Sequence, residues 1–150
     1  MPESAKARAE TDDLCKKLTF SSAKPVIMSN NILGLRTTIY KVHDMIEAKR
    51  WYTSMFGVQP YFDEPFYIGF TIGGYELGLQ PDEVRGEKGD NVVAYWGVED
   101  VSAAYKKFTD AGALGYEAPN EVGGGIIVAI VKDPWGNAIG LIHNPHFQLS

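Results

Sequence analysis

The chain has 150 residues, of which 45% are hydrophobic, 12% aromatic and 22% charged, a composition typical of globular proteins and not of disordered or fibrous ones. The formal net charge is −5 and no run of Lys and Arg could follow a phosphate backbone, so nucleic acid is not an expected partner. Cys15 is the only cysteine, which excludes an internal disulfide, and we expect a cytoplasmic protein.

The first 30 residues differ from the rest and are interpreted as an N-terminal extension. Residues 3–17 are rich in Ala, Lys and Glu and predict a short surface helix, and Pro25 ends whatever precedes it. The acidic residues of this segment argue against an organelle transit peptide, and neither a signal peptide nor a membrane span is predicted. We therefore expect residues 31–150 to form the domain, and we expect no membrane partner.

The domain contains an internal repeat. Residues 35–42 predict a β-strand, and residues 44–56 predict a helix that begins with Asp44 and Glu47 in a capping-box pattern. A second strand and helix follow at residues 92–98 and 100–112. Both strand ends and both helix starts are 56 positions apart along the chain. Such a constant spacing indicates two copies of one structural unit.

Three further strands are predicted after each helix, at residues 58–63, 66–72, 75–80, 115–119, 126–132 and 138–143. Gly73-Gly74 is a hairpin turn signal, and residues 133–137 (DPWGN) have turn-forming types in the expected places. The charged segment 82–90 predicts a linker. The sequence thus predicts an α+β fold with two tandem βαβββ modules, at residues 34–81 and 91–146.

The two modules, the V-x-D start of each helix and the ending DPWGNAIGLI resemble the vicinal oxygen chelate superfamily. This group includes glyoxalase I, extradiol dioxygenases, fosfomycin-resistance enzymes and bleomycin-resistance binding proteins. The resemblance covers residues 34–146 and implies that the paired modules form a curved mixed sheet around a cleft. Several chemistries share this fold, so the resemblance is a poor guide to function.

The resemblance also implies where a metal would be held. In the superfamily's enzymes, His or Gln from each module's first strand and Glu from each last strand bind a divalent metal. These four positions correspond to Thr37, Gly78, Val93 and Gly140, and none of them offers the usual side-chain ligand. We therefore expect no metal and no other cofactor. A divalent metal is implied only if the protein is an enzyme with a displaced metal site.

Glu76 is the one candidate for a catalytic group, as a base. It lies two residues before Gly78, so strand alternation places both on the same face of the sheet. A solvated or hydrogen-bonded structural carboxylate is the alternative interpretation of Glu76. The three histidines are interpreted as turn or surface residues.

The strands that line the cleft predict a ligand-binding surface. Glycines at the two carboxylate positions predict open volume near the cleft centre, and strand alternation points Tyr95 into the cleft and Trp96 away from it, under a helix. The ligand-binding candidates are Thr37, Ile39, Tyr67, Glu76, Gly78, Gln80, Val93, Tyr95, Trp135 and Gly140.

Three function classes follow. We favour a metal-free protein, similar to the bleomycin-resistance branch, that binds a small apolar or aromatic molecule in the cleft. The alternatives are an enzyme, either a lyase such as lactoylglutathione lyase or a dioxygenase, and an interaction module with a vestigial cleft. We also expect a homodimer, because two-fold dimers are the commonest assembly. The sequence leaves open whether the modules pair within one chain or between two.

Overall fold

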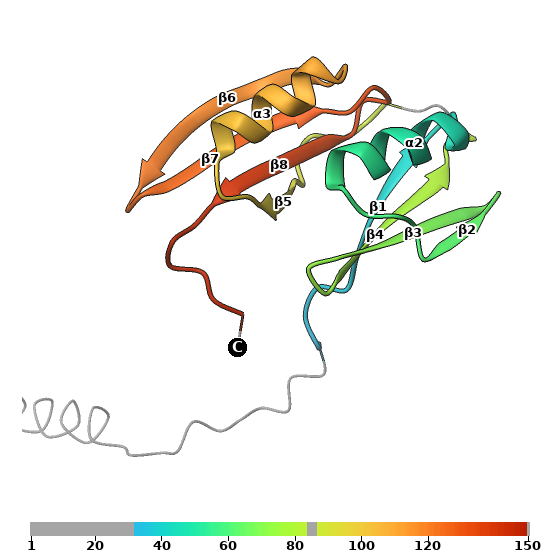
Figure 1. The fold of residues 1–150 in the computed structure, drawn as a ribbon, viewed down its shortest axis with the longest axis horizontal. Coiled ribbons are helices and arrows are strands. Elements are labelled where there is room, and N and C mark those ends of the chain that lie inside the picture. Colours follow the sequence, from blue (N-terminus) through green and yellow to red (C-terminus); the bar gives the residue numbers. More distant parts are fainter. Residues whose placement is uncertain (1–31, 84–86, 150) are drawn as a thin grey trace, which may run out of the picture. The chain divides into compact units, whose positions relative to one another are not determined.

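The structure, a computed structural model, describes residues 32–83 and 87–149 (Figure 1). The chain divides into two compact units, Met1–Gly34 and Leu35–Ser150, and all the described helices and strands belong to the second. The predicted extension with its short helix lies outside the described residues. Among the helices that the structure describes, none is long and apolar enough to cross a membrane.

The second unit contains two βαβββ modules in tandem (Figure 1). The first module consists of β1 (Thr37–Val42), α2 (Met45–Phe56), β2 (Phe62–Glu64), β3 (Tyr67–Ile72) and β4 (Tyr75–Pro81). The second consists of β5 (Ala94–Gly97), α3 (Val101–Asp110), β6 (Leu114–Gly123), β7 (Ile126–Lys132) and β8 (Ala138–His143). The predicted α+β fold is confirmed.

Each module forms a four-stranded mixed sheet, with strand orders β1-β4-β3-β2 and β5-β8-β7-β6. In both sheets the first strand runs parallel to the last, with Thr37 opposite Glu76 in one and Tyr95 opposite Gly140 in the other. The remaining pairs are antiparallel. The sequence repeat is therefore also a repeat of strand pairing.

The largest differences from the predicted strand boundaries are at the start of β2 and the end of β6, and proline explains both. The β2 pairing begins late because Pro60 has no N–H to donate, and the first hydrogen bond runs from the Tyr61 N–H to the Gly69 carbonyl, at 2.9 Å. Conversely, β6 continues past Pro119, where the strand was expected to end. Pro119 lies in a register shift between Glu117 and Asn120 on an edge strand, where no ladder hydrogen bond is lost.

The local signals for the helix and hairpin ends are confirmed. The Asp44 carboxylate accepts a hydrogen bond from the Glu47 N–H at 2.9 Å, and Asp100 does the same for Ala103 at the start of α3. Gly73 and Gly74 have φ values of 55° and 87°, which a two-residue hairpin of this kind requires and most other residues resist.

The two modules share one hydrophobic core. Buried side chains alternate along the strands, with Leu77 and Leu79 on β4 and Ile139 and Leu141 on β8. Aromatic rings join the modules, since Trp51 on α2 lies 5.7 Å from Phe108 on α3. The two modules of this chain therefore pack against each other.

Trp96 contributes to the same core. Its ring packs edge-on against Phe56 of α2, with the centroids 5.3 Å apart, and its indole N–H donates to the Tyr40 hydroxyl at 3.1 Å. The expectation that Trp96 faces away from the open side of the sheet is confirmed.

Candidate functional site

The candidate site lies on the face of the first sheet that α2 does not cover. Side chains on this face alternate with the buried residues of β1 and β4, and the register places Ile39 opposite Gly78 and Thr37 opposite Glu76. Six predicted ligand-binding residues are brought together in this module. They are Thr37, Ile39, Tyr67, Glu76, Gly78 and Gln80.

Glu76 is the polar centre of this face. Its carboxylate accepts hydrogen bonds from the hydroxyls of Tyr61 and Tyr67, and from the Thr37 hydroxyl at 3.3 Å. These hydrogen bonds, above all the one from Tyr61, lower the pKa of Glu76 below its ordinary value. The carboxylate is therefore ionised at neutral pH. Because a lowered pKa makes a carboxylate a weaker base, this environment disfavours a general-base role for Glu76.

The two tyrosines are held as neutral donors. The hydrogen bond to Glu76 raises the pKa of Tyr61, and partial burial followed by the hydrogen bond to Glu76 raises the pKa of Tyr67. Both phenols thus keep their protons at neutral pH, and Glu76 remains the anionic group of the cluster.

Glycines allow the tyrosines to reach Glu76. A Cβ atom on Gly69 would lie 2.9 Å from Cε1 of Tyr61, and a Cβ on Gly78 would overlap the Tyr67 hydroxyl and lie 2.6 Å from Cδ1 of Ile39. The space above each glycine is therefore already occupied. The prediction of open volume at Gly78 is wrong, because neighbouring side chains fill the room that the missing carboxylate leaves.

The same correction applies in the second module. Tyr95 and Gly140 are paired in the register, and a Cβ on Gly140 would lie 2.6 Å from Cδ1 of Tyr95 and 2.9 Å from the Ala94 carbonyl oxygen. Tyr95 thus shares the face of Gly140, as strand alternation predicted, but it fills the expected opening. Val93 lies just before β5 and is half-buried.

An open groove of about 580 Å³ lies next to the tyrosine cluster, at the carboxyl ends of β1 and β4. Ile39, Phe66 and Gln80 line the part of the groove that belongs to the open face. The rest of the lining is mainly polar and charged, and it includes Lys41, Asp82, Glu83, Glu87, Lys88 and Asn137. The predicted ligand-binding residues Ile39 and Gln80 line this groove, which does not include the glycines at the predicted centre.

Sequence reasoning missed Tyr61 as a partner of Glu76, and it missed the rings of Phe62 and Phe66 that extend from Tyr67. Tyr61 is 61% exposed and Phe66 is 65% exposed, and the Phe62 ring lies 6.1 Å from both Phe66 and Tyr67. The mid-strand Gly69 was the available signal, because a glycine inside a strand often marks a site where another group approaches closely.

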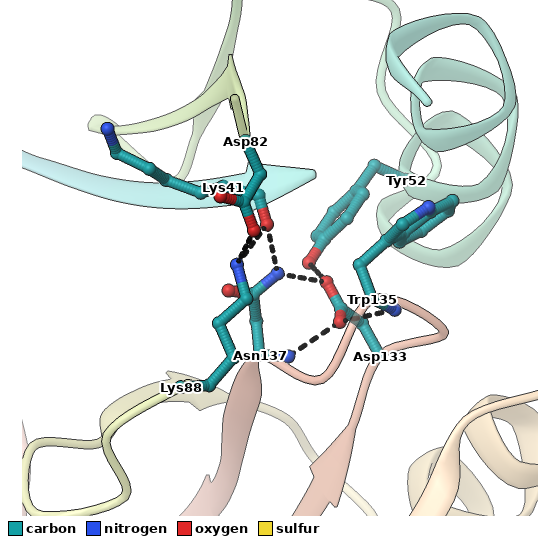
Figure 2. Close-up of polar contacts among 7 residues, drawn as sticks. All are labelled: Lys41, Tyr52, Asp82, Lys88, Asp133, Trp135 and Asn137. Carbon is teal, nitrogen blue, oxygen red and sulfur yellow. Dashed lines mark hydrogen bonds and ion pairs between the residues drawn. The ribbon is translucent and has the colours of Figure 1, made fainter. Parts of the chain in front are cut away.

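Trp135 is not brought to the open face. Its ring lies 6.0 Å from Trp51 and stacks on Tyr52 at 6.3 Å, among the residues packed against the core. The turn that contains Trp135 has a structural role instead, and its centre is Asp133 (Figure 2).

Asp133 is a buried carboxylate, 3% exposed, that joins the two modules. It accepts hydrogen bonds from the Tyr52 hydroxyl at 2.6 Å, from the Trp135 N–H at 2.9 Å, and from the Asn137 N–H and side-chain amide at 2.7 and 2.8 Å (Figure 2). Burial raises the pKa of Asp133, and these hydrogen bonds oppose that shift without cancelling it.

The linker is tied to the same junction (Figure 2). The Asn137 side-chain amide and the Lys88 ammonium group both donate to the Lys41 carbonyl at 2.9 Å, and Lys88 forms an ion pair with Asp82 at 2.7 Å. These contacts hold the end of β1, the linker and the DPWGN turn together beside the groove.

The residues present do not fit the metal that the superfamily's enzymes use. Thr37, Gly78, Val93 and Gly140 supply no imidazole or carboxylate ligand, and Glu76 is a single carboxylate bound by hydroxyl donors. Within residues 32–83 and 87–149, no group of three or more His, Cys, Asp or Glu side chains is placed to hold a metal ion.

Gly78→Ala is expected to separate Tyr67 from Glu76. The new methyl group would overlap the Tyr67 hydroxyl, and because the contact is with the far end of a side chain, the fold should persist at a cost of about 1–3 kcal/mol. The pKa of Glu76 should rise, since the carboxylate loses a donor. Carboxyl NMR titration and urea unfolding measure the two effects. Tyr67→Phe, which removes the same donor without overpacking, should raise the pKa alike, and an unchanged pKa in both variants would contradict this account.

Parallel first and last strands in each of two tandem βαβββ modules define a class of paired-module proteins. The chain belongs to the Glyoxalase/Bleomycin resistance protein/Dioxygenase superfamily, whose family model matches residues 34–141. The resemblance identified from the sequence is thereby confirmed. No curated protein matches the chain.

Solved structures with the same fold differ widely from this chain in sequence. A glyoxalase-related enzyme from Fulvimarina pelagi is 18% identical with a TM-score of 0.65, the match covering 79% of this chain and 94% of that one. A lactoylglutathione lyase from Agrobacterium tumefaciens is 16% identical with a TM-score of 0.61, the match covering 79% of this chain and 99% of that one. These similarities establish the fold alone.

Proposed function

We propose that this protein binds a small apolar or aromatic molecule on the open face of its first module, without a metal or other cofactor. The main support is the combination of an open groove with exposed apolar side chains at its border. Ile39 is 39% exposed on the sheet, and both Ile39 and the exposed Phe66 line the groove. The groove's volume of about 580 Å³ falls within the range of about 300–1,000 Å³ that small-molecule sites occupy.

The enzyme alternative has less support. A lyase or dioxygenase of this superfamily would need a metal or a strong base, and the donor set fits neither requirement. Glu76 is the only carboxylate among the six candidate residues of the first module, and its lowered pKa weakens it as a proton acceptor. Binding without chemistry needs only a shaped surface, which agrees with the side chains present.

A pair of matched variants tests the binding proposal. Ile39→Gln alters the centre of the open face, whereas Ile46→Gln alters an equally apolar, exposed position on α2. N-Phenyl-1-naphthylamine, a neutral aromatic probe, should bind the wild type and Ile46→Gln equally in a fluorescence titration. Ile39→Gln should weaken binding by about tenfold, since a polar amide replaces an apolar contact.

The addition of divalent metals is a second test of the binding proposal. Zn²⁺, Ni²⁺, Fe²⁺ and Mn²⁺ should leave the melting temperature and the probe affinity unchanged, because a ligand stabilises only a native state that binds it. Stoichiometric metal binding with glyoxalase or dioxygenase turnover that chelators abolish would overturn the proposal. Equal probe binding by both isoleucine variants would place the ligand elsewhere and overturn it too.

A further inference from the structure

The negative charge of Glu76 on the open face has no cationic partner among the residues that the structure describes. Oε1 of Glu76 accepts from Thr37 and Tyr67, whereas Oε2 accepts only from Tyr61, so acceptor capacity remains on Oε2. All three donors are neutral hydroxyls. None of the ion pairs formed among residues 32–83 and 87–149 includes Glu76. The carboxylate is half-exposed, so its charge is within reach of a ligand.

Two tyrosines contact this charge through their hydroxyls, and further aromatic rings lie beyond one of them. Tyr61 and Tyr67 both donate to Glu76, and Phe62 links Tyr67 to Phe66 through ring contacts of 6.1 Å each. The face of an aromatic ring is electron-rich and attracts cations, most strongly those that are weakly hydrated, such as substituted ammonium groups. A carboxylate beside several rings therefore selects for positive charge on an apolar body.

We propose that the ligand of this face is an organic cation, a substituted ammonium group joined to an aromatic or apolar body. The ammonium group lies at Glu76 against the rings of Tyr61 and Tyr67, and the body extends past Ile39 toward the groove. This inference rests on the proposed function and deepens it by naming the class of ligand.

The surroundings favour a cation over the other ligand classes. An anion would meet Glu76 directly. Of the two lysines that line the groove, Lys41 and Lys88, the second is already bound to Asp82 and the Lys41 carbonyl. Three carboxylates, Asp82, Glu83 and Glu87, line the groove as well. The formal net charge of −5 also attracts cations toward the protein. A neutral aromatic molecule would use the rings but leave the charge of Glu76 without a function.

The test compares two molecules of equal shape on the full chain. Benzyltrimethylammonium and neopentylbenzene differ in having nitrogen or carbon at the branch point, and therefore in charge alone. Calorimetric or NMR titration of the wild type should give an affinity for the cation higher by about tenfold or more, as expected for combined cation–π and carboxylate contacts. The difference should shrink at high salt.

Variants assign the difference to the site. Glu76→Gln retains the size and an acceptor but not the charge, and it should reduce the preference for the cation by about tenfold. Glu117→Gln, which neutralises an exposed strand carboxylate in the second module, should not change it. Tyr61→Leu should weaken cation binding more than Tyr61→Phe, because phenylalanine keeps the ring. This last comparison decides the outcome if Glu76→Gln does not fold.

The possible failures are distinguishable. Equal affinities for the two molecules, with binding still lost in Ile39→Gln, would overturn the cation proposal and leave the proposed function standing. A preference for the cation that persists in Glu76→Gln would also overturn it, since the charge would then be recognised elsewhere. Binding of neither molecule nor of the neutral probe would overturn both proposals.

Discussion

Asp133→Ala is expected to destabilise the protein by about 3–5 kcal/mol, because each buried donor left without an acceptor costs about 1–3 kcal/mol. The Tyr52 hydroxyl and the Asn137 amide lose their common acceptor, and Tyr52 is fully buried. Urea unfolding followed by tryptophan fluorescence measures the loss directly, since Trp51 and Trp135 lie beside the junction. A loss below about 1 kcal/mol, within the effect of ordinary surface substitutions, would contradict the junction's structural role.

Asp133→Asn is the size-matched comparison. It removes the charge and keeps one acceptor oxygen, while its amide NH2 replaces the other oxygen and faces groups that donate to it in the wild type. It should cost less than Asp133→Ala. It should also change the pH dependence of stability, because burial raises the pKa of Asp133 above the ordinary 3.8. Because the pKa is raised in the native state, the native state takes up this proton at a higher pH than the unfolded state does. The free energy of unfolding therefore increases through this group as the pH falls toward 3.8, the ordinary pKa of the unfolded chain.

Glu76 acts in the opposite sense. The native pKa of Glu76 lies below the ordinary 4.5. Its contribution to the free energy of unfolding is therefore present above pH 4.5 and is lost as the pH falls and the carboxylate protonates. Comparing the wild type with Asp133→Asn isolates the Asp133 contribution from that of Glu76. The stability difference should move in favour of the wild type as pH decreases, and a difference that is flat or moves the other way would show that burial does not dominate at Asp133.

Features set by a few neighbouring residues were predictable from the sequence. Asp44 and Asp100 cap their helices because a carboxylate at that position reaches the N–H three residues on. Gly73-Gly74 forms the hairpin for a similarly local reason. The module repeat was also predictable, because a constant spacing indicates a repeated unit wherever the strands lie in space.

Which side chains fill the site depends on the register of the strands and on how far each side chain extends. Neither could be predicted from the sequence. Gly78 was assigned from the sequence to a ligand position of the superfamily, but whether Tyr67 or solvent fills the space there depends on how β3 pairs with β4. Tyr61 lies 15 positions from Glu76 and reaches it only because Gly69 has no side chain. Trp135 illustrates the same point, since its turn folds into the core that the two modules share.

Trp51→Ala is expected to cost about 3–5 kcal/mol, the usual range for removing a large aromatic side chain from a packed site. The indole N–H of Trp51 donates to the Ala111 carbonyl at 2.8 Å, and its ring contacts Phe108 and Trp135 of the second module. Trp51→Phe keeps most of the ring and loses only the donor, so it should cost about 0.5–1.5 kcal/mol plus a small packing loss.

The loss of hydrogen-exchange protection in each module is a more specific measurement than the total loss of stability. Since the Trp51 ring belongs to the first module and its partners to the second, Trp51→Ala should lower amide hydrogen-exchange protection in β5–β8 as well as in β1–β4. Met55→Ala serves as a comparison, because Met55 is a buried α2 residue and its hydrogen bond with the second module, from Lys107 at 2.9 Å, is made by the backbone carbonyl, which the variant keeps. It should affect β1–β4 more than β5–β8. If Trp51→Ala left protection in the second module intact, the aromatic contacts would not couple the modules, and each would have to be stable through its own sheet and helix.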